Sequence, residues 1–181
     1  MARMSKKAAK SKSKPKPKAR VKAKAAKPSP VPKGYRTVQP YLIVDGAAKA
    51  LAFYKAAFGA KERMRMAAPG GKIGHAEIEI GDCIVMLADE APNWDAYAPA
   101  KYGGSPVSLM IYVANVDAVV KKAIAAGGKL TREVKDQFYG DRSGAVEDPF
   151  GQHWHIATHV EDVPPKEMDL RRKARMKWAG S

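Results

Sequence analysis

The side chains best suited to chemistry lie in two short stretches that have the composition of β-strands. His75 and Glu77 are alternate residues in the first stretch, GHAEIEI. Alternate residues of a strand share one face, so this pair can act as a base with an orienting carboxylate. The alternative is a polar strip at the edge of a sheet.

The second stretch, HWHIATH, carries three histidines. In a helix, His155 and His159 would be spaced like a zinc-binding pair, but the β-rich context and the preceding turn DPFG favour a strand. On a strand, His153 and His155 share a face with His159. They can contact one ligand, or they are hydrogen-bonded cavity histidines that bind nothing.

Three further features have both a chemical and a structural interpretation. Asp141 and Arg142 can bind an anionic or hydroxylated ligand, or they belong to a turn that the aspartate stabilises. The single cysteine, Cys83, excludes an intrachain disulfide and a cysteine-based zinc cluster, and its apolar strand favours a small buried side chain. The segment 148–151 is interpreted as a structural turn.

The elements that position these residues form a repeat. A shift of 69 positions aligns residues 44–59 with 113–128, each being a strand end, a polar turn, an amphipathic helix and a glycine. Three short strands follow each helix, so the order β-α-β-β-β occurs twice. The predicted strands are 38–44, 60–66, 74–80 and 83–88 in the first copy, and 107–113, 129–135, 144–147 and 153–159 in the second.

This pattern predicts an α+β fold, in which two βαβββ modules form a curved, partly closed mixed sheet with outer helices. Module one covers residues 35–89, a linker loop covers 90–106, and module two covers 107–160. Residues 164–181 are predicted to be a basic helix, packed through Met168, Leu170 and Met176 against the body or a partner subunit.

Strand alternation also predicts which side chains face the concave side of the sheet. The apolar members of each strand should pack on the helices, which leaves polar, methionine and tyrosine side chains for a cavity. We expect the ligand cavity to be formed by Gln39, Tyr41, His75, Glu77, Met86, Ser108, Tyr112, Arg142, His153 and His155.

Charge separates the chain into two parts. The net charge is +15, but residues 1–36 hold 11 Lys and 3 Arg with no acidic residue. The segment 1–34 is rich in Lys, Ala and Pro, so it is predicted to be disordered, and residues 1–33 to bind nucleic acid without sequence preference. The alternative is a solvated tail without a partner. No apolar run is long enough to cross a membrane, and we expect a cytoplasmic protein.

Several segments of the body resemble one family. LAFYKAAFGA, GHAEIEIGDCIVMLADE and YGDRSGAVEDPFGQHWHIATHVEDV, within the doubled module, resemble the vicinal oxygen chelate (VOC) superfamily. This superfamily includes glyoxalase I, bleomycin-resistance proteins and extradiol dioxygenases, and the chain is most similar to its PhnB-like group. The resemblance covers about residues 35–163, which it identifies as a glyoxalase-like domain.

The resemblance also implies where a divalent metal would bind. Its metal-dependent members use four inward-facing residues, and these positions fall here on Gln39, Met86, Ser108 and His155. Only His155 is a good ligand for a divalent metal. We therefore expect a homodimer that binds a small molecule, without the usual four-ligand metal site.

Two alternatives stay open. The first is a metal-dependent lyase or dioxygenase in which His155 acts with His75, Glu77 or His153. The second is a nucleic-acid-associated protein that acts through its basic tail.

Overall fold

The computed structural model describes residues 27–179, and it contains the predicted repeat. Each half of the body is a strand, a helix and three further strands, so the fold is α+β as predicted. Module one has β1 (Tyr41–Val44), α1 (Ala47–Phe58), β2 (Lys61–Ala67), β3 (Ile73–Ile80) and β4 (Cys83–Asp89). Module two has β5 (Ser108–Tyr112), α2 (Val116–Ala125), β6 (Lys129–Asp136), β7 (Asp141–Glu147) and β8 (His153–His159).

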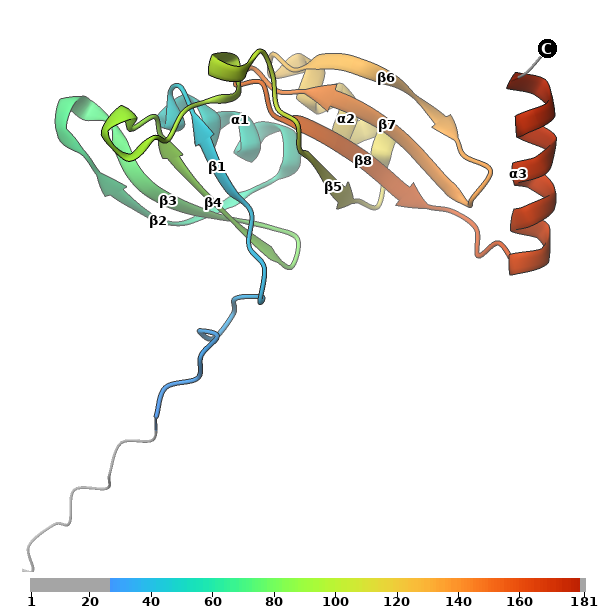
Figure 1. The fold of residues 1–181 in the computed structure, drawn as a ribbon, viewed down its shortest axis with the longest axis horizontal. Helices are drawn as coiled ribbons and strands as arrows, with labels where there is room; N and C mark the ends of the chain where they lie inside the picture. Colours follow the sequence, from blue (N-terminus) through green and yellow to red (C-terminus); the bar gives the residue numbers. More distant parts are fainter. Residues whose placement is uncertain (1–26, 180–181) are drawn as a thin grey trace, which may run out of the picture.

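The two modules have the same topology. The strand orders are β1-β4-β3-β2 and β5-β8-β7-β6, with a parallel first pair and antiparallel neighbours elsewhere. Each module keeps its own four-stranded sheet, and the sheets are not closed onto each other. Figure 1 shows them side by side, with α1 and α2 lying behind them. Both sheets therefore present a helix-free face on the other side.

Local sequence explains where the two covering helices begin and end. Gly46 and Gly59 flank α1 in the left-handed conformation, at φ values of 98° and 69°, which glycine adopts without steric cost. Asn115 caps α2 by accepting a hydrogen bond from the backbone N–H of Ala118 at 2.9 Å. The two helices pack against each other behind the sheets, and the core is continuous across both modules.

An aspartate in the turn between β7 and β8 joins the two modules. Asp148 is buried and accepts hydrogen bonds from the hydroxyl of Tyr54 on α1 at 2.8 Å and from the indole N–H of Trp154 at 2.9 Å. The backbone N–H groups of Phe150 and Gln152 donate to its other oxygen, both at 2.9 Å. The turn 148–151 is therefore structural, as predicted, and it also links the modules.

The linker between the modules is an ordered segment with two short 3-10 helices, η2 (Pro92–Trp94) and η3 (Pro99–Tyr102). A third, η1 (Pro69–Gly71), connects β2 to β3. The side chains of Tyr97 and Tyr102 meet edge to face, with their ring centroids 6.4 Å apart. The linker therefore brings an aromatic surface to the junction between the two sheets.

The C-terminal helix α3 (Pro165–Ala179) stands apart from the sheets in Figure 1. The prediction that Leu170 and Met176 pack on the body is wrong for the single chain, because these side chains are 61% and 64% exposed. Polar contacts hold the helix instead. Arg171 pairs with Glu161 at 2.7 Å, and the guanidinium of Arg175 lies 5.7 Å from the ring centre of Phe138.

The basic tail predicted for residues 1–34 lies mostly outside the described residues, which begin at position 27. Among the helices in residues 27–179, none has both the length and the apolar composition that a membrane span needs.

Candidate functional site

A buried carboxylate organises the helix-free face of module one. Glu77 on β3 is only 5% exposed, and the hydroxyl of Tyr35 donates to its two oxygens at 2.6 and 2.8 Å. Arg63 on β2 lies 3.5 Å from the same carboxylate, with its guanidinium 5.3 Å from the centre of the Tyr35 ring. The hydrogen bond from Tyr35, aided by His75 and Arg63, lowers the pKa of Glu77 and keeps it charged.

His75 connects this carboxylate to the open surface. Its Nε2 lies 3.5 Å from Glu77 Oε1, and its Nδ1 lies 3.0 Å from the hydroxyl of Tyr41 on β1. A proton on Nε2 suits the carboxylate, in which case Nδ1 accepts from the Tyr41 hydroxyl. Burial raises the pKa of Tyr41, so its hydroxyl stays protonated at neutral pH. Tyr41, His75 and Glu77 thus form one oriented polar chain.

Two hollows lie on either side of Tyr41 and its neighbour Ile43. The larger has a volume of about 590 Å³ and extends between β1 and β5 beneath the linker. The smaller has a volume of about 520 Å³ and lies between β1, β3 and the start of the linker, where Trp94 lines it. The larger hollow is lined mainly by apolar and aromatic residues, among them Leu42, Tyr97, Pro99, Tyr102, Val107 and Leu109.

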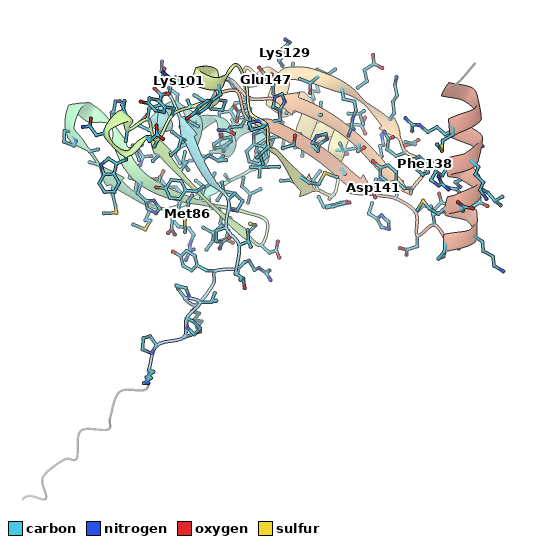
Figure 2. All side chains as sticks on the ribbon, viewed as in Figure 1. Met86, Lys101, Lys129, Phe138, Asp141 and Glu147 are labelled. Atoms are coloured by element: carbon cyan, nitrogen blue, oxygen red, sulfur yellow. The ribbon has the colours of Figure 1, made fainter. Side chains whose placement is uncertain are left out.

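The predicted cavity positions Met86 and Gln39 belong to the same region of module one. In the sheet register Met86 lies between Tyr41 on β1 and Glu77 on β3, so it is in the middle of the helix-free face. Figure 2 labels Met86 on β4. The amide of Gln39, correctly oriented, hydrogen-bonds the backbone of Arg36 and Ile84 at 3.0 Å each, which gives it a structural role.

The helix-free face of module two carries a second polar chain. The hydroxyl of Tyr112 on β5 donates to the buried Asp141 on β7 at 2.9 Å, and His159 Nδ1 lies 2.8 Å from the other oxygen of Asp141. His159 Nε2 lies 3.0 Å from Asp162. Asp141 is therefore the first residue of a strand with its carboxylate occupied, and not part of a free anion-binding turn.

The other predicted histidines lie beside this chain on β8. His153 pairs with Ser108 on β5 in the register, and its Nε2 is 3.8 Å from Glu147. His155 pairs with Met110 on one side and with Ala145 on the other. Burial, followed by the positive charge of Arg132, lowers the pKa of His155 and keeps it neutral at pH 7.

Arg142 differs from the other predicted cavity residues. Its guanidinium makes two hydrogen bonds of 2.8 Å to Asp117 on α2 and one of 3.1 Å to Asp136. It therefore lies on the helix-covered side of β7 and binds α2 to the sheet. The expectation that it faces the cavity is corrected, because strand alternation directs Asp141 and Arg142 to opposite sides.

The residues at the four metal positions that the resemblance implies do not fit a divalent metal. Gln39 is bonded to the backbone, Met86 and Ser108 are poor ligands for hard or borderline cations, and His155 is the single imidazole. Within residues 27–179, no three His, Cys, Asp or Glu side chains are grouped so that they can hold a metal ion. His75 and Glu77 lie on the sheet of module one, whereas His153 and His155 lie on that of module two.

Sequence reasoning missed Tyr35 and Arg63. Tyr35 is the first aromatic residue after the basic tail, which was the only available signal for it. Arg63 is at an irregularity in the β2–β3 register between Glu62 and Met64. Such a bulge re-aims a side chain, and strand alternation does not predict it.

Similar proteins agree with this architecture. An uncharacterized protein of Mycobacterium tuberculosis is 40% identical over 134 residues, which are 72% of this chain and 79% of that protein. The crystal structure of an Arabidopsis thaliana gene product is 28% identical, with a TM-score of 0.56, and the match covers 68% of this chain and 98% of the other.

Two more distant structures share the fold alone. TioX from Micromonospora sp. ML1 is 23% identical with a TM-score of 0.54, and the match covers 71% of this chain and all of the other. A fosfomycin resistance protein, FosX from Listeria monocytogenes, was solved with Mn(II) and is 16% identical. Its TM-score is 0.53, and the match covers 75% of this chain and 94% of the other.

The model of one protein family matches residues 36–156, which include β1 to β7 and the first four residues of β8. With the repeated βαβββ modules, this match shows that the chain belongs to the Glyoxalase/Bleomycin resistance protein/Dioxygenase superfamily.

Proposed function

We propose that this protein binds a small organic molecule between the helix-free faces of its modules, without the four-ligand metal site of its metal-dependent relatives. The observation that supports this most is the larger hollow, whose apolar and aromatic lining adjoins the Tyr41–His75–Glu77 chain. Its volume of about 590 Å³ is typical of sites for small ligands. Apolar walls bind such a ligand, and the few polar groups orient it.

The same faces are the proposed contact in a homodimer. Tyr41, Met110 and Tyr112 are large side chains that remain exposed on the helix-free faces of the single chain. Exposed apolar surface of this kind is typical of an interaction site. A second copy would cover these faces and close the hollows. Light scattering coupled to gel filtration tests this: a mass of two chains supports it, and a monomer at micromolar concentration contradicts it.

Ligand binding is tested by titrating the full chain with 2-naphthol in a buffer that contains EDTA, following tryptophan fluorescence. We expect saturable binding that Tyr41→Ala weakens. Ile124→Ala, which truncates an exposed apolar side chain on α2, serves as the matched control and should leave the affinity for 2-naphthol unchanged. The absence of saturable binding, or an equal effect of both variants, contradicts the proposed function.

Metal analysis tests the same proposal against a metal-dependent lyase or dioxygenase. Protein without an affinity tag is incubated with Mn²⁺, Fe²⁺, Ni²⁺ or Zn²⁺, dialysed and analysed. A metal bound at one equivalent, and lost in His155→Ala, would establish the metal-dependent alternative. Substoichiometric metal that His155→Ala leaves unchanged supports the metal-independent site.

The basic segment supports a separate proposal, that residues 1–33 bind nucleic acid without sequence preference. The observation behind it is the charge of this part of the chain, since almost all of the net charge of +15 comes from residues 1–36. A gel-shift assay at physiological salt compares the full chain with a variant lacking residues 1–33. We expect only the full chain to shift DNA, and an equal shift by both forms contradicts the proposal.

A further inference from the structure

Among the side chains that the structure describes, one arginine on the helix-free face of module two lacks an acidic partner. Arg63, Arg142 and Arg171 each have a carboxylate within 4.0 Å. No such ion pair is formed by Arg132 with any residue in the described part of the chain, 27–179, and its side chain is exposed. A cation without an acidic partner on this face is available to a ligand.

The sheet register places His155 beside this arginine. Arg132 on β6 is opposite Ala145 on β7, and Ala145 is opposite His155 on β8. The side chains of Arg132, Ala145 and His155 therefore lie on the same face of the sheet. Between Arg132 and His155 there is only the methyl side chain of Ala145. Both can therefore reach one group of a ligand placed above Ala145.

A buried hydroxyl without a partner lies next along β7. Ser143 Oγ is fully buried, and it is the one buried side-chain oxygen or nitrogen in residues 27–176 that lacks a hydrogen bond. Ser143 shares its face with Ala145, two residues further along the strand. Leaving a buried hydroxyl without a hydrogen bond costs stability, so Ser143 is available to an acceptor that the described part of the chain does not supply.

Arg132 also lines a hollow of about 290 Å³ that contains cations, Lys135 and Arg175, and acids, Glu133 and Asp136. Both acids are already in ion pairs, Glu133 with Lys135 at 2.8 Å and Asp136 with Arg142 at 3.1 Å, so they leave the charge of Arg132 to a ligand. The groups that face His155 are Arg132 from β6 and His153 on its own strand. Its neighbours on β5, Ser108 and Met110, carry no charge, and Glu147 on β7 lies against His153.

We propose that module two contains an oxyanion subsite in which Arg132 and His155 donate hydrogen bonds to a carboxylate or phosphate of the ligand, with Ser143 beside them. This inference rests on the proposed function and narrows its ligand to an anionic molecule with an apolar or aromatic body. The anionic group lies over β7, and the body extends across β8 and β5 toward the hollow under the linker. A neutral His155 still offers an N–H group, and a bound anion makes its protonated form more favourable.

The test compares three probes that share one ring system: 2-naphthol, 2-naphthoate and 2-naphthyl phosphate. Their affinities for the full chain are measured by calorimetry. Hydrogen bonds to charged groups predict that at least one anion binds about tenfold or more tightly than 2-naphthol. The anion with the larger advantage identifies carboxylate or phosphate as the natural group.

Two variants that each remove one positive charge show whether the affinity for the anion depends on Arg132 itself or only on the net charge of the protein. Arg132→Gln should remove most of the advantage of the anion and change the affinity for 2-naphthol less than twofold. Lys121→Gln, on the exposed side of α2, should change neither. In addition, nuclear magnetic resonance titration of His155 should show its pKa rising when the anion is bound, and this rise should be smaller in Arg132→Gln.

Each failure has its own pattern. If 2-naphthol binds but the anions bind no more tightly, or if Lys121→Gln acts as strongly as Arg132→Gln, the oxyanion subsite is wrong and the proposed function stands. If none of the three probes binds, the proposed function fails, and this inference fails with it.

Discussion

At the scale of single residues, most polar side chains on the helix-free faces are hydrogen-bonded to one another, and a few have no such partner. Glu77 and Asp141 are both buried acids, and each accepts a tyrosine hydroxyl and faces a histidine. The two modules thus carry the same arrangement at different positions of their sheets. In each module the buried acid holds the side chains of the histidine and the tyrosine in one orientation.

Glu77→Gln tests this arrangement in module one. The amide can still accept from Tyr35 but loses the ion pair with Arg63, so we expect a free energy of unfolding lower by about 1–2 kcal/mol at pH 7. The pKa of Glu77 is lowered in the folded state, so its contribution is present above the unfolded value of about 4.3 and is lost as the pH falls through the folded pKa. Urea unfolding at pH 7 and below pH 4 should show the difference between wild type and variant shrinking in acid. A constant difference contradicts this assignment.

His159 gives the opposite pH dependence in module two. Asp141, followed by Asp162, raises its pKa. Because the pKa is higher in the folded state, protonated His159 stabilises the fold at pH values below its unfolded pKa of about 6.5. This contribution is lost as the pH rises through the folded pKa. Nuclear magnetic resonance titration should show a pKa above 6.5 for His159 that falls in Asp141→Asn. A wild-type value at or below 6.5 excludes the ion pairs in solution.

The sequence predicted the types and faces of most residues but not their partners. Alternation along β3 and β8 was enough to place His75, Glu77 and the three histidines of β8 on the helix-free side. It could not predict that Tyr35 reaches Glu77, 42 positions away. Arg142 was interpreted as part of a turn, so alternation was not applied to it and its contact with Asp117 was missed. Such pairs depend on the packing of distant segments, which local periodicity does not encode.

At the scale of elements, periodicity was sufficient because each element has one apolar side. The predicted strand 153–159 matches β8, and α1 lies within the predicted repeat unit 44–59. The strand predicted at 144–147 is longer in the structure, because β7 begins at Asp141, within a segment that reads as a turn. The C-terminal helix was predicted correctly as an element, but Leu170 and Met176 do not pack on the body of the single chain. An ion pair between Arg171 and Glu161 connects α3 to the segment before it.

Deletion of residues 164–181 tests how little α3 contributes to the fold. The helix contacts the body through Arg171, bonded to Glu161, and through Arg175, placed over Phe138. Exposed ion pairs contribute at most about 1 kcal/mol each, so we expect a melting temperature within a few degrees of the full chain. Thermal unfolding followed by circular dichroism measures this. A loss of folded structure on deletion would show that α3 is part of the core.

At the scale of the whole molecule, the two modules are joined by one continuous core and by Asp148. The rings of Tyr54 and Phe58 on α1 lie 5.4 and 4.7 Å from that of Trp154 on β8, measured between centroids. Asp148 binds both Tyr54 and Trp154 in this interior. The modules should therefore unfold together, which keeps the two helix-free faces in a fixed relation.

Asp148→Ala tests this joint. It leaves the Tyr54 hydroxyl and the Trp154 N–H without an acceptor in the interior, so we expect a loss of about 3–5 kcal/mol in a single unfolding transition. Asp148→Asn, which keeps an acceptor, should lose less. Two separate transitions in the wild-type protein, measured by calorimetry, would mean that the modules fold independently.

The central claim is that the helix-free faces bind a small molecule, and mapping a bound probe on the protein tests it most directly. Backbone amide signals of the full chain are assigned and followed during titration with 2-naphthoate. The account predicts that the largest shifts occur on β1, β5 and β8, around Tyr41, Leu109 and His155. Shifts confined to α1 and α2, on the opposite side of the sheets, would contradict it.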